Sequence, residues 1–200
     1  MSRLLIVLCL TPLAAVAAPA PKAKSAPYYH PTREGDTQVY ETRTGDSATE
    51  YTMVVKKVET VDGRLRVTTA RELTADKSIE STVEVSAAGV YRRVGDRDPV
   101  PVLKLPAKVG DSWSPSQTAP GGLAAAASLT YTVGAADEEV EVPAGKFKCI
   151  RIDGAADLGG RTMKMTAWYA PGVGMVKTTT DTGAGGQERV VVLKAFQPGK

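Results

Sequence analysis

Histidine and cysteine are scarce in this sequence of 200 residues, which contains one histidine, His30, and two cysteines, Cys9 and Cys149. One histidine cannot form a two-histidine metal site, and no cysteine stands near it at ligand spacing, so we expect neither a metal nor a cofactor. We expect His30 at the surface near the start of the domain. Cys9 lies in an N-terminal apolar run that we expect to be removed. Cys149 then has no disulfide partner and is expected to be a small buried residue.

A strong net charge is also missing. The chain has 25 basic and 22 acidic side chains, a net charge of +3. Removal of the N-terminal segment, whose one charge is Arg3, leaves 24 basic side chains and a net charge of +2. The lysines and arginines are spread along the chain and form no basic block, so nucleic acid is not expected as a partner.

Recognisable catalytic motifs are absent as well. The sequence has no nucleophile elbow, phosphate loop, dinucleotide fingerprint or alternating-aspartate calcium loop. Its candidate carboxylate pairs come from Asp137, Glu138 and Glu139 and from Asp153 with Asp157. We expect the first group on a turn before a strand and the second on either side of a turn at residues 154–156. A hydrolase based on two of these carboxylates is the least favoured hypothesis, and no catalytic residue is predicted.

The first residues have the order of a secretory signal peptide. Arg3 precedes an apolar run at residues 4–10, and Ala15-Val16-Ala17 fits a small-residue cleavage site. The run is shorter than the roughly 20 residues needed to span a bilayer. We therefore predict a signal peptide at 1–17, export to the periplasm or the medium, and no transmembrane segment after cleavage. An uncleaved N-terminal anchor is the alternative.

Beyond the signal, residues 18–27 contain three prolines and small side chains and predict a short flexible leader. The rest of the chain, residues 28–197, predicts one β-rich domain, because apolar and polar residues alternate with a period of two. The alternating apolar positions include Leu65, Val67, Ile79, Val83, Val85, Met163 and Met165. Asp62-Gly63 between two such runs indicates a hairpin. The predicted fold class is all-β, a curved antiparallel sheet or half-barrel.

Three segments depart from simple alternation. Residues 146–153 carry apolar side chains on both faces, which indicates a bulge or a strand covered on both sides. Residues 190–193 are all apolar and predict a central or covered strand. Residues 121–127, rich in glycine and alanine, could form one or two helical turns or a loop.

A weak internal similarity relates two short segments. Residues 31–37 (PTREGDT) resemble residues 106–112 (PAKVGDS), and each precedes strand-like sequence. One interpretation is a single sheet built from two similar halves. The other is coincidence among common turn residues.

Two longer motifs carry a family resemblance. They are residues 140–150 (VEVPAGKFKCI) and residues 168–177 (WYAPGVGMVK). With the early Gly35-Asp36 pair, they resemble the TapB-like family of uncharacterised exported bacterial proteins, so that 28–197 would be a TapB-like domain. The resemblance implies a sheet similar to that of LolA-like lipoprotein carriers, a half-barrel with an apolar concave side. The family implies no catalytic residues.

Methionine adapts its shape to irregular surroundings and suits both cores and apolar binding sites. Our leading hypothesis is a non-enzymatic envelope protein that holds an apolar or lipid-like ligand, such as a lipid or a lipidated protein segment, on the concave face. The residues predicted to line that site are Met53, Leu65, Val67, Met163 and Met165. The alternative is a structural or protein-interaction module that binds an envelope protein and no small ligand.

Overall fold

The computed structural model describes residues 28–74, 77–93, 95, 98–114, 129–157, 162–181 and 187–200. The predicted signal peptide, leader and residues 121–127 lie outside the described residues. Within these ranges every regular element is a strand, as predicted, and no helix is long and apolar enough to cross a membrane. The strands are β1 (Thr37–Thr44), β2 (Ser47–Val61), β3 (Arg64–Thr74), β4 (Lys77–Ser86), β5 (Gly89–Arg93), β6 (Val100–Lys104), β7 (Ser112–Trp113), β8 (Leu129–Val142), β9 (Gly145–Asp157), β10 (Thr162–Ala170), β11 (Gly174–Asp181) and β12 (Arg189–Gln197).

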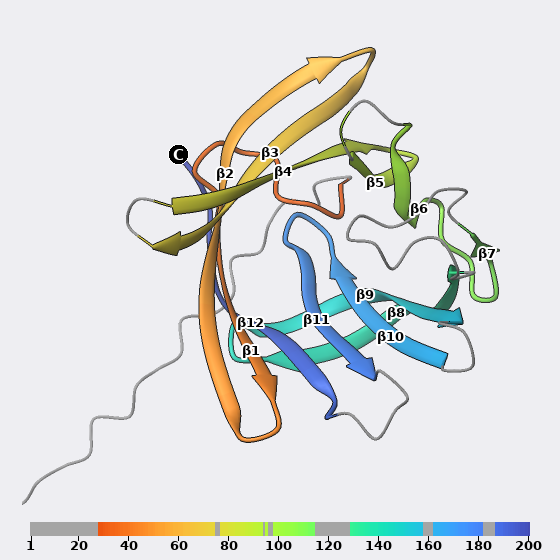
Figure 1. Ribbon diagram of the computed structural model, residues 1–200. Helices are drawn as coiled ribbons and strands as arrows, with labels where there is room; N and C mark the ends of the chain where they lie inside the picture. Colours follow the sequence, from red (N-terminus) through yellow and green to blue (C-terminus); the bar gives the residue numbers. More distant parts are fainter. Residues whose placement is uncertain are drawn as a thin grey trace, which may run out of the picture.

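All twelve strands belong to one antiparallel sheet, in the order β6-β5-β4-β3-β2-β1-β12-β11-β10-β9-β8-β7. Each half of the chain forms an up-and-down meander, and β1 joins the halves by pairing with β12 (Figure 1). The predicted apolar segment 190–193 lies in β12, between β1 and β11, which confirms that it is central. Strands β6 and β7 are the two edges, so the sheet is not closed.

Turn chemistry sets the reversals of the chain. Asp62 and Gly63 both have positive φ angles (50° and 73°) in the tight β2–β3 turn, which confirms the predicted hairpin. Gly145, after Pro143 and Ala144, has a φ of 129° at the start of β9. Few residues other than glycine adopt such an angle, so this position fixes where the β8–β9 hairpin turns.

The two halves repeat the same local structure. Gly35 N donates to Val55 O and Val55 N donates to Asp36 O, both at 2.9 Å. Gly110 N with Val133 O, and Val133 N with Asp111 O, form the same pair of bonds at the same 2.9 Å. This correspondence places β1–β6 against β7–β12 in chain order and supports the interpretation of two similar halves.

The sheet curls so that one face is enclosed. Val90 and Leu103, near one edge of the sheet, pack in one cluster with Trp113, Val133 and Ile152, near the other edge. We call this enclosed side the inner face. At the seam between β6 and β7, Trp113 Nε1 donates to Pro101 O at 3.2 Å. Side chains therefore join the two edges where backbone pairing is missing.

One end of the curled sheet is filled, and we call it the floor. There the β8–β9 hairpin reaches across to β12, where Ala144 N donates to Leu193 O at 3.2 Å. The hairpin contributes to a buried cluster of nine residues: Tyr40, Val140, Val142, Cys149, Ala170, Val173, Val176, Val191 and Leu193. Below it, Gln38 Nε2 donates to Val173 O at 2.8 Å and Tyr40 Oη donates to Met175 O at 2.7 Å.

The opposite end is the rim, where β1 joins β2, β3 joins β4, β9 joins β10 and β11 joins β12. Here the predicted turn at residues 154–156 is wrong, because β9 continues through them to Asp157. Close packing favours glycine at position 154, because a Cβ there would lie 3.3 Å from the Tyr131 ring and 3.4 Å from Met165 Cε. The acidic group at 137–139 lies inside β8, beside a bulge, and not on a turn before a strand.

Candidate functional site

The inner face changes from buried to accessible between the floor and the rim. On β4, Val85 is fully buried, whereas Ile79, six residues earlier and on the same face, is 57% exposed. On β10 and β9, Met163 and Met165 pair with Ala156 and Gly154 and are half-buried. The rim thus offers apolar side chains that the fold covers only in part.

The five predicted lining residues share the inner face but lie in two places. Val67 is fully buried and, with Leu65 packed against it, belongs to the core under β2–β4. Met53 packs against the floor cluster. Met163 and Met165 lie at the rim, near the β9–β10 connection, and are partly exposed.

Polar groups that the sequence analysis did not select stand at the same rim. The Arg71 guanidinium lies 4.1 Å from the centroid of the Tyr51 ring, and Tyr51 in turn stacks on Tyr40 at 5.3 Å. Burial raises the pKa of Tyr51, while the charges of Arg71 and Arg189 lower it. The stacked guanidinium is held in place by the ring.

Three polar atoms in this region are buried without a hydrogen-bond partner in the described structure: Arg71 Nε, Thr42 Oγ1 and Thr178 Oγ1. Thr42 and Thr178 pair with Val191 from either side, so their side chains lie on the inner face. Buried polar groups are nearly always bonded, so these three atoms have bonding capacity left for water, an ion or a ligand.

A third arginine faces the interior from the other half of the rim. Arg92 pairs with Val83 on the inner face of β4–β5. Burial raises the pKa of Tyr131, and burial together with Tyr131 raises that of Tyr169 to about 12, while Arg92 lowers both. Arg92 is therefore on the inner face of β5, beside β4, and its charge acts on tyrosines of β8 and β10.

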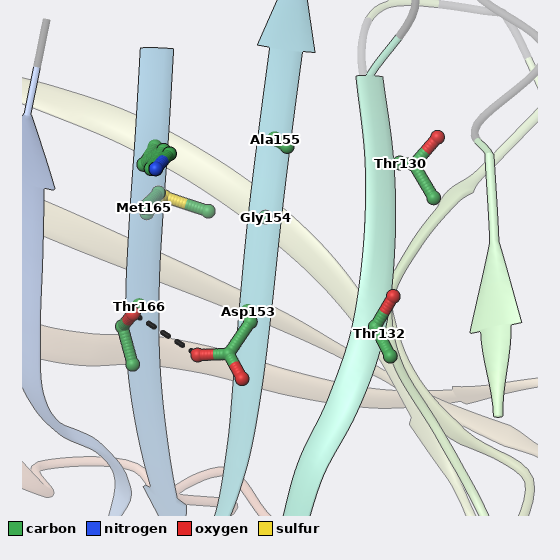
Figure 2. Close-up of a pocket in the computed structure, with 8 residues that line it drawn as sticks. Thr130, Thr132, Asp153, Gly154, Ala155, Met165 and Thr166 are labelled. Carbon is green, nitrogen blue, oxygen red and sulfur yellow. Dashed lines mark hydrogen bonds between the residues drawn. The ribbon is translucent and has the colours of Figure 1, made fainter. Parts of the chain in front are cut away.

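A hollow of about 330 Å³ lies over β8, β9 and β10 (Figure 2). Its lining residues are Thr130, Thr132, Asp153, Gly154, Ala155, Lys164, Met165 and Thr166. Thr166 Oγ1 donates to Asp153 Oδ1 at 3.0 Å, the bond drawn in Figure 2. Asp153 and Thr166 are thus bonded to each other, and Met165 connects this hollow with the inner face of β10.

Two predicted carboxylates meet beside that hollow. Arg151 donates from Nη1 to Glu138 Oε2 at 3.0 Å and from Nε to Asp153 Oδ2 at 3.3 Å. Glu138 Oε1 also accepts a bond from Trp168 Nε1 at 2.9 Å. An arginine thus stands between the two acids and holds both as ion pairs. Over the described ranges, no three metal-ligating side chains gather.

His30 and Cys149 are both structural. The His30 side chain is mostly enclosed and not on the surface as predicted: its Nδ1 lies 2.7 Å from Pro31 O, and burial lowers its pKa to about 4. Cys149 is buried as predicted, and burial, with Glu138, raises its thiol pKa to about 12. Neither side chain is available at the rim.

Comparison with known proteins identifies the fold. A family model described as DUF3108-like matches residues 133–184, which include all of β9, β10 and β11. A crystal structure from Bacteroides fragilis, a "putative exported protein with YmcC-like fold", is 16% identical, with a TM-score of 0.57 over 85% of this chain and 99% of that one. A "putative lipoprotein" from Parabacteroides distasonis is 14% identical, with a TM-score of 0.59 over 87% and 100%. No curated protein matches the chain.

Sequence reasoning missed the rim arginines although a signal was present. Leu65, Val67, Thr69 and Arg71 alternate on one face of β3, so the pattern that predicted a buried face also placed a charge on it. Arg92 follows Val90 in the same way on β5. In the sequence, the signal for these residues is an arginine that follows apolar residues on the same face of a strand.

Proposed function

We propose that the protein is a non-enzymatic, exported binding protein that holds an apolar or lipid-like ligand at the rim of its inner face. One observation carries the proposal. The enclosed face is filled at the floor, yet it leaves Ile79, Met163 and Met165 accessible at the rim. Ligand sites are mostly apolar, so accessible apolar side chains beside an enclosed face support a binding role.

The N-terminal sequence and the two structural neighbours, one described as exported and the other as a lipoprotein, support an envelope location. The resemblance to the TapB-like family and to LolA-like carriers adds to the same proposal. The natural ligand would be a lipid or a lipidated protein segment, whose acyl chain would lie against the methionines.

The first test is native mass spectrometry of the protein purified from a bacterial periplasm. We expect extra mass that is lost on denaturation, with lipid in the organic extract. A bare protein mass, unchanged after incubation with membrane lipids, would contradict the proposal and favour the interaction module.

A matched pair of substitutions locates the site. Met165→Glu places a charge on the inner face, whereas Lys164→Glu changes the neighbouring residue on the outer face. We expect Met165→Glu to weaken binding of the neutral dye N-phenyl-1-naphthylamine at least about tenfold, because a buried carboxylate must be desolvated, and Lys164→Glu to leave it unchanged. If Met165→Glu does not fold, Met165→Gln serves as the milder variant. Equal effects of both changes would contradict the placement.

A further inference from the structure

The two faces of the sheet differ in charge. On the outer face arginines are paired: Glu84 lies 3.0 Å from Arg93, 3.4 Å from Arg64 and 3.9 Å from Arg66. Arg92, one residue before Arg93, points to the opposite face. Over the described ranges, none of the ion pairs involves Arg71, Arg92 or Arg189.

No carboxylate balances these charges on the inner face. In the register, Asp153 and Asp157 lie with Thr166 and Thr162 on the outer side of β9–β10, and Glu80 and Glu84 lie opposite to Ile79 and Val85 on β4. Asp181 pairs with Lys164, again on the outer side. The described strands therefore present cations, tyrosines, threonines and apolar groups to the interior of the rim, and no acid.

Of the four buried polar atoms without a partner in the described structure, three lie on the inner face, and the fourth, Arg66 Nε, belongs to the outer face. Arg71 is fixed on Tyr51, with its Nε buried and unbonded. Arg189 pairs with Thr44 and Thr180, one step nearer the rim than the row of Thr42, Val191 and Thr178. A planar guanidinium with a pre-set orientation is suited to a carboxylate or phosphate group, which it can bind with two parallel bonds, and the inner-face hydroxyls of Thr42 and Thr178 can donate further bonds.

We propose that the rim binds the anionic end of an amphipathic ligand, with Arg71 and Arg189 as its charge partners and Thr42 and Thr178 as hydroxyl donors. This inference rests on the proposed function, in which the apolar chain of the ligand lies against Met163 and Met165. The ligand class is thus a long-chain carboxylate or phosphate, and a neutral lipid would bind less well.

The test compares three probes with the same chain: dodecyl phosphate, dodecanoate and dodecanol, each displacing the neutral dye. We expect the two anions to displace it at concentrations at least about tenfold lower than dodecanol, since bonds to charged groups are stronger than neutral ones. Added salt should reduce this preference. Inorganic phosphate alone should not displace the dye, and displacement by it would overturn the amphipathic assignment.

Substitutions then assign the residues. Arg71→Gln and Arg189→Gln should each remove most of the preference for the anions while the affinity for dodecanol stays the same. Arg43→Gln is the control, because Arg43 is exposed and paired with Glu41 on the outer face. Dye and dodecanol binding without any anion preference would overturn this inference and leave the proposed function standing. No binding of the dye or of any probe would overturn both.

Discussion

At the scale of single residues, burial of a titratable group links stability to pH, and His30 shows this most clearly. Its enclosed ring stays neutral in the folded protein at neutral pH, because burial lowers its pKa to about 4, against the opposing effects of the Pro31 carbonyl and Asp36. In the unfolded chain the same ring would titrate near pH 6.5. Folding must therefore exclude a proton between these two values.

Burial of His30 makes the free energy of unfolding depend on pH in one direction. Below about pH 6.5 the unfolded state binds a proton that the folded state does not, so stability falls as the pH drops from about 6.5 to about 4. The loss from this one group is at most about 3 kcal/mol. Urea unfolding at pH 7.5 and pH 5 should show a smaller pH effect in His30→Gln than in the natural chain. An equal pH effect in both would show that His30 is not responsible.

The Arg71–Tyr51 pair is a second feature at the scale of single residues, and it differs from the ion pairs that stabilise the fold. A structural arginine would be expected to have a carboxylate partner, as Arg93 has in Glu84. Arg71 instead has an aromatic ring on one side and an unbonded, buried Nε. The arrangement fixes the orientation of the cation without neutralising its charge, which is the state that a binding residue requires.

At the scale of elements, the two Gly-Asp turns show how burial changes the contribution of one turn to stability, because the same turn occurs once buried and once exposed. The Asp36 carboxylate is 3% exposed and accepts bonds from Arg33 N at 3.0 Å and from Gly199 N at 2.8 Å. Asp111 is exposed and accepts the equivalent bond from Lys108 N at 3.1 Å. The first turn therefore also anchors the C-terminal end of the chain.

Asp36→Ala should cost about 2–4 kcal/mol of unfolding free energy, because it leaves two amides near a buried position without an acceptor. Asp111→Ala should cost about 1 kcal/mol or less, since water can replace the lost bond. Chemical denaturation of both variants measures the difference. Similar costs would show that the anchoring of the C-terminal end adds nothing to stability.

The strands themselves could be predicted from alternation, but their irregularities could not. Register shifts between Val133 and Ala135 and between Ala135 and Glu138 break the pattern in β8, so sequence reasoning placed the acidic group on a turn. Gly154 was interpreted as part of a turn for lack of a side chain, whereas its small size serves packing between Tyr131 and Met165. Bulges and close packing depend on the partner strand, which is distant in sequence.

The candidate site, like the strands, could be predicted from the sequence only in part. Alternation was sufficient to place Met163 and Met165 on one face, and the structure puts both at the rim. It could not separate them from Val67, because burial along a strand depends on how the sheet curls. Curling is a property of the whole sheet, and so the accessible part of the inner face is visible only in three dimensions.

At the scale of the whole molecule, the seam between β6 and β7 is the place where a complete ring of strands is missing. The repeat relates the central β1–β12 pair to this seam, which is bridged by the bond from Trp113 to Pro101 O and by apolar packing. Edges of this kind are sites of fraying and of unwanted pairing. We infer that Trp113 limits both.

Trp113→Phe keeps an aromatic ring and removes the bond, so we expect a loss of about 1 kcal/mol in stability. Amide hydrogen exchange in β6 should accelerate, while that in β12 should not. Trp168→Phe is the matched control, because the Trp168 indole bonds to Glu138 on the outer face, away from the seam. Faster exchange in β6 in both variants would contradict a specific role for Trp113.

The order of the strands has a consequence for the connectivity of the chain. Read from β7 through β12 and on through β1 to β6, the sheet is one uninterrupted meander from edge to edge. The C-terminal end already lies beside the first turn, since Gly199 N bonds to Asp36. A circular permutant that links the two ends and is cut between β6 and β7 would make every strand pair local in sequence. Folding should then be faster, because lower contact order speeds folding. In the present connectivity the one long-range strand pairing, β1 with β12, instead lies at the centre of the sheet, and β6 and β7, which follow one another in the chain, form its two edges.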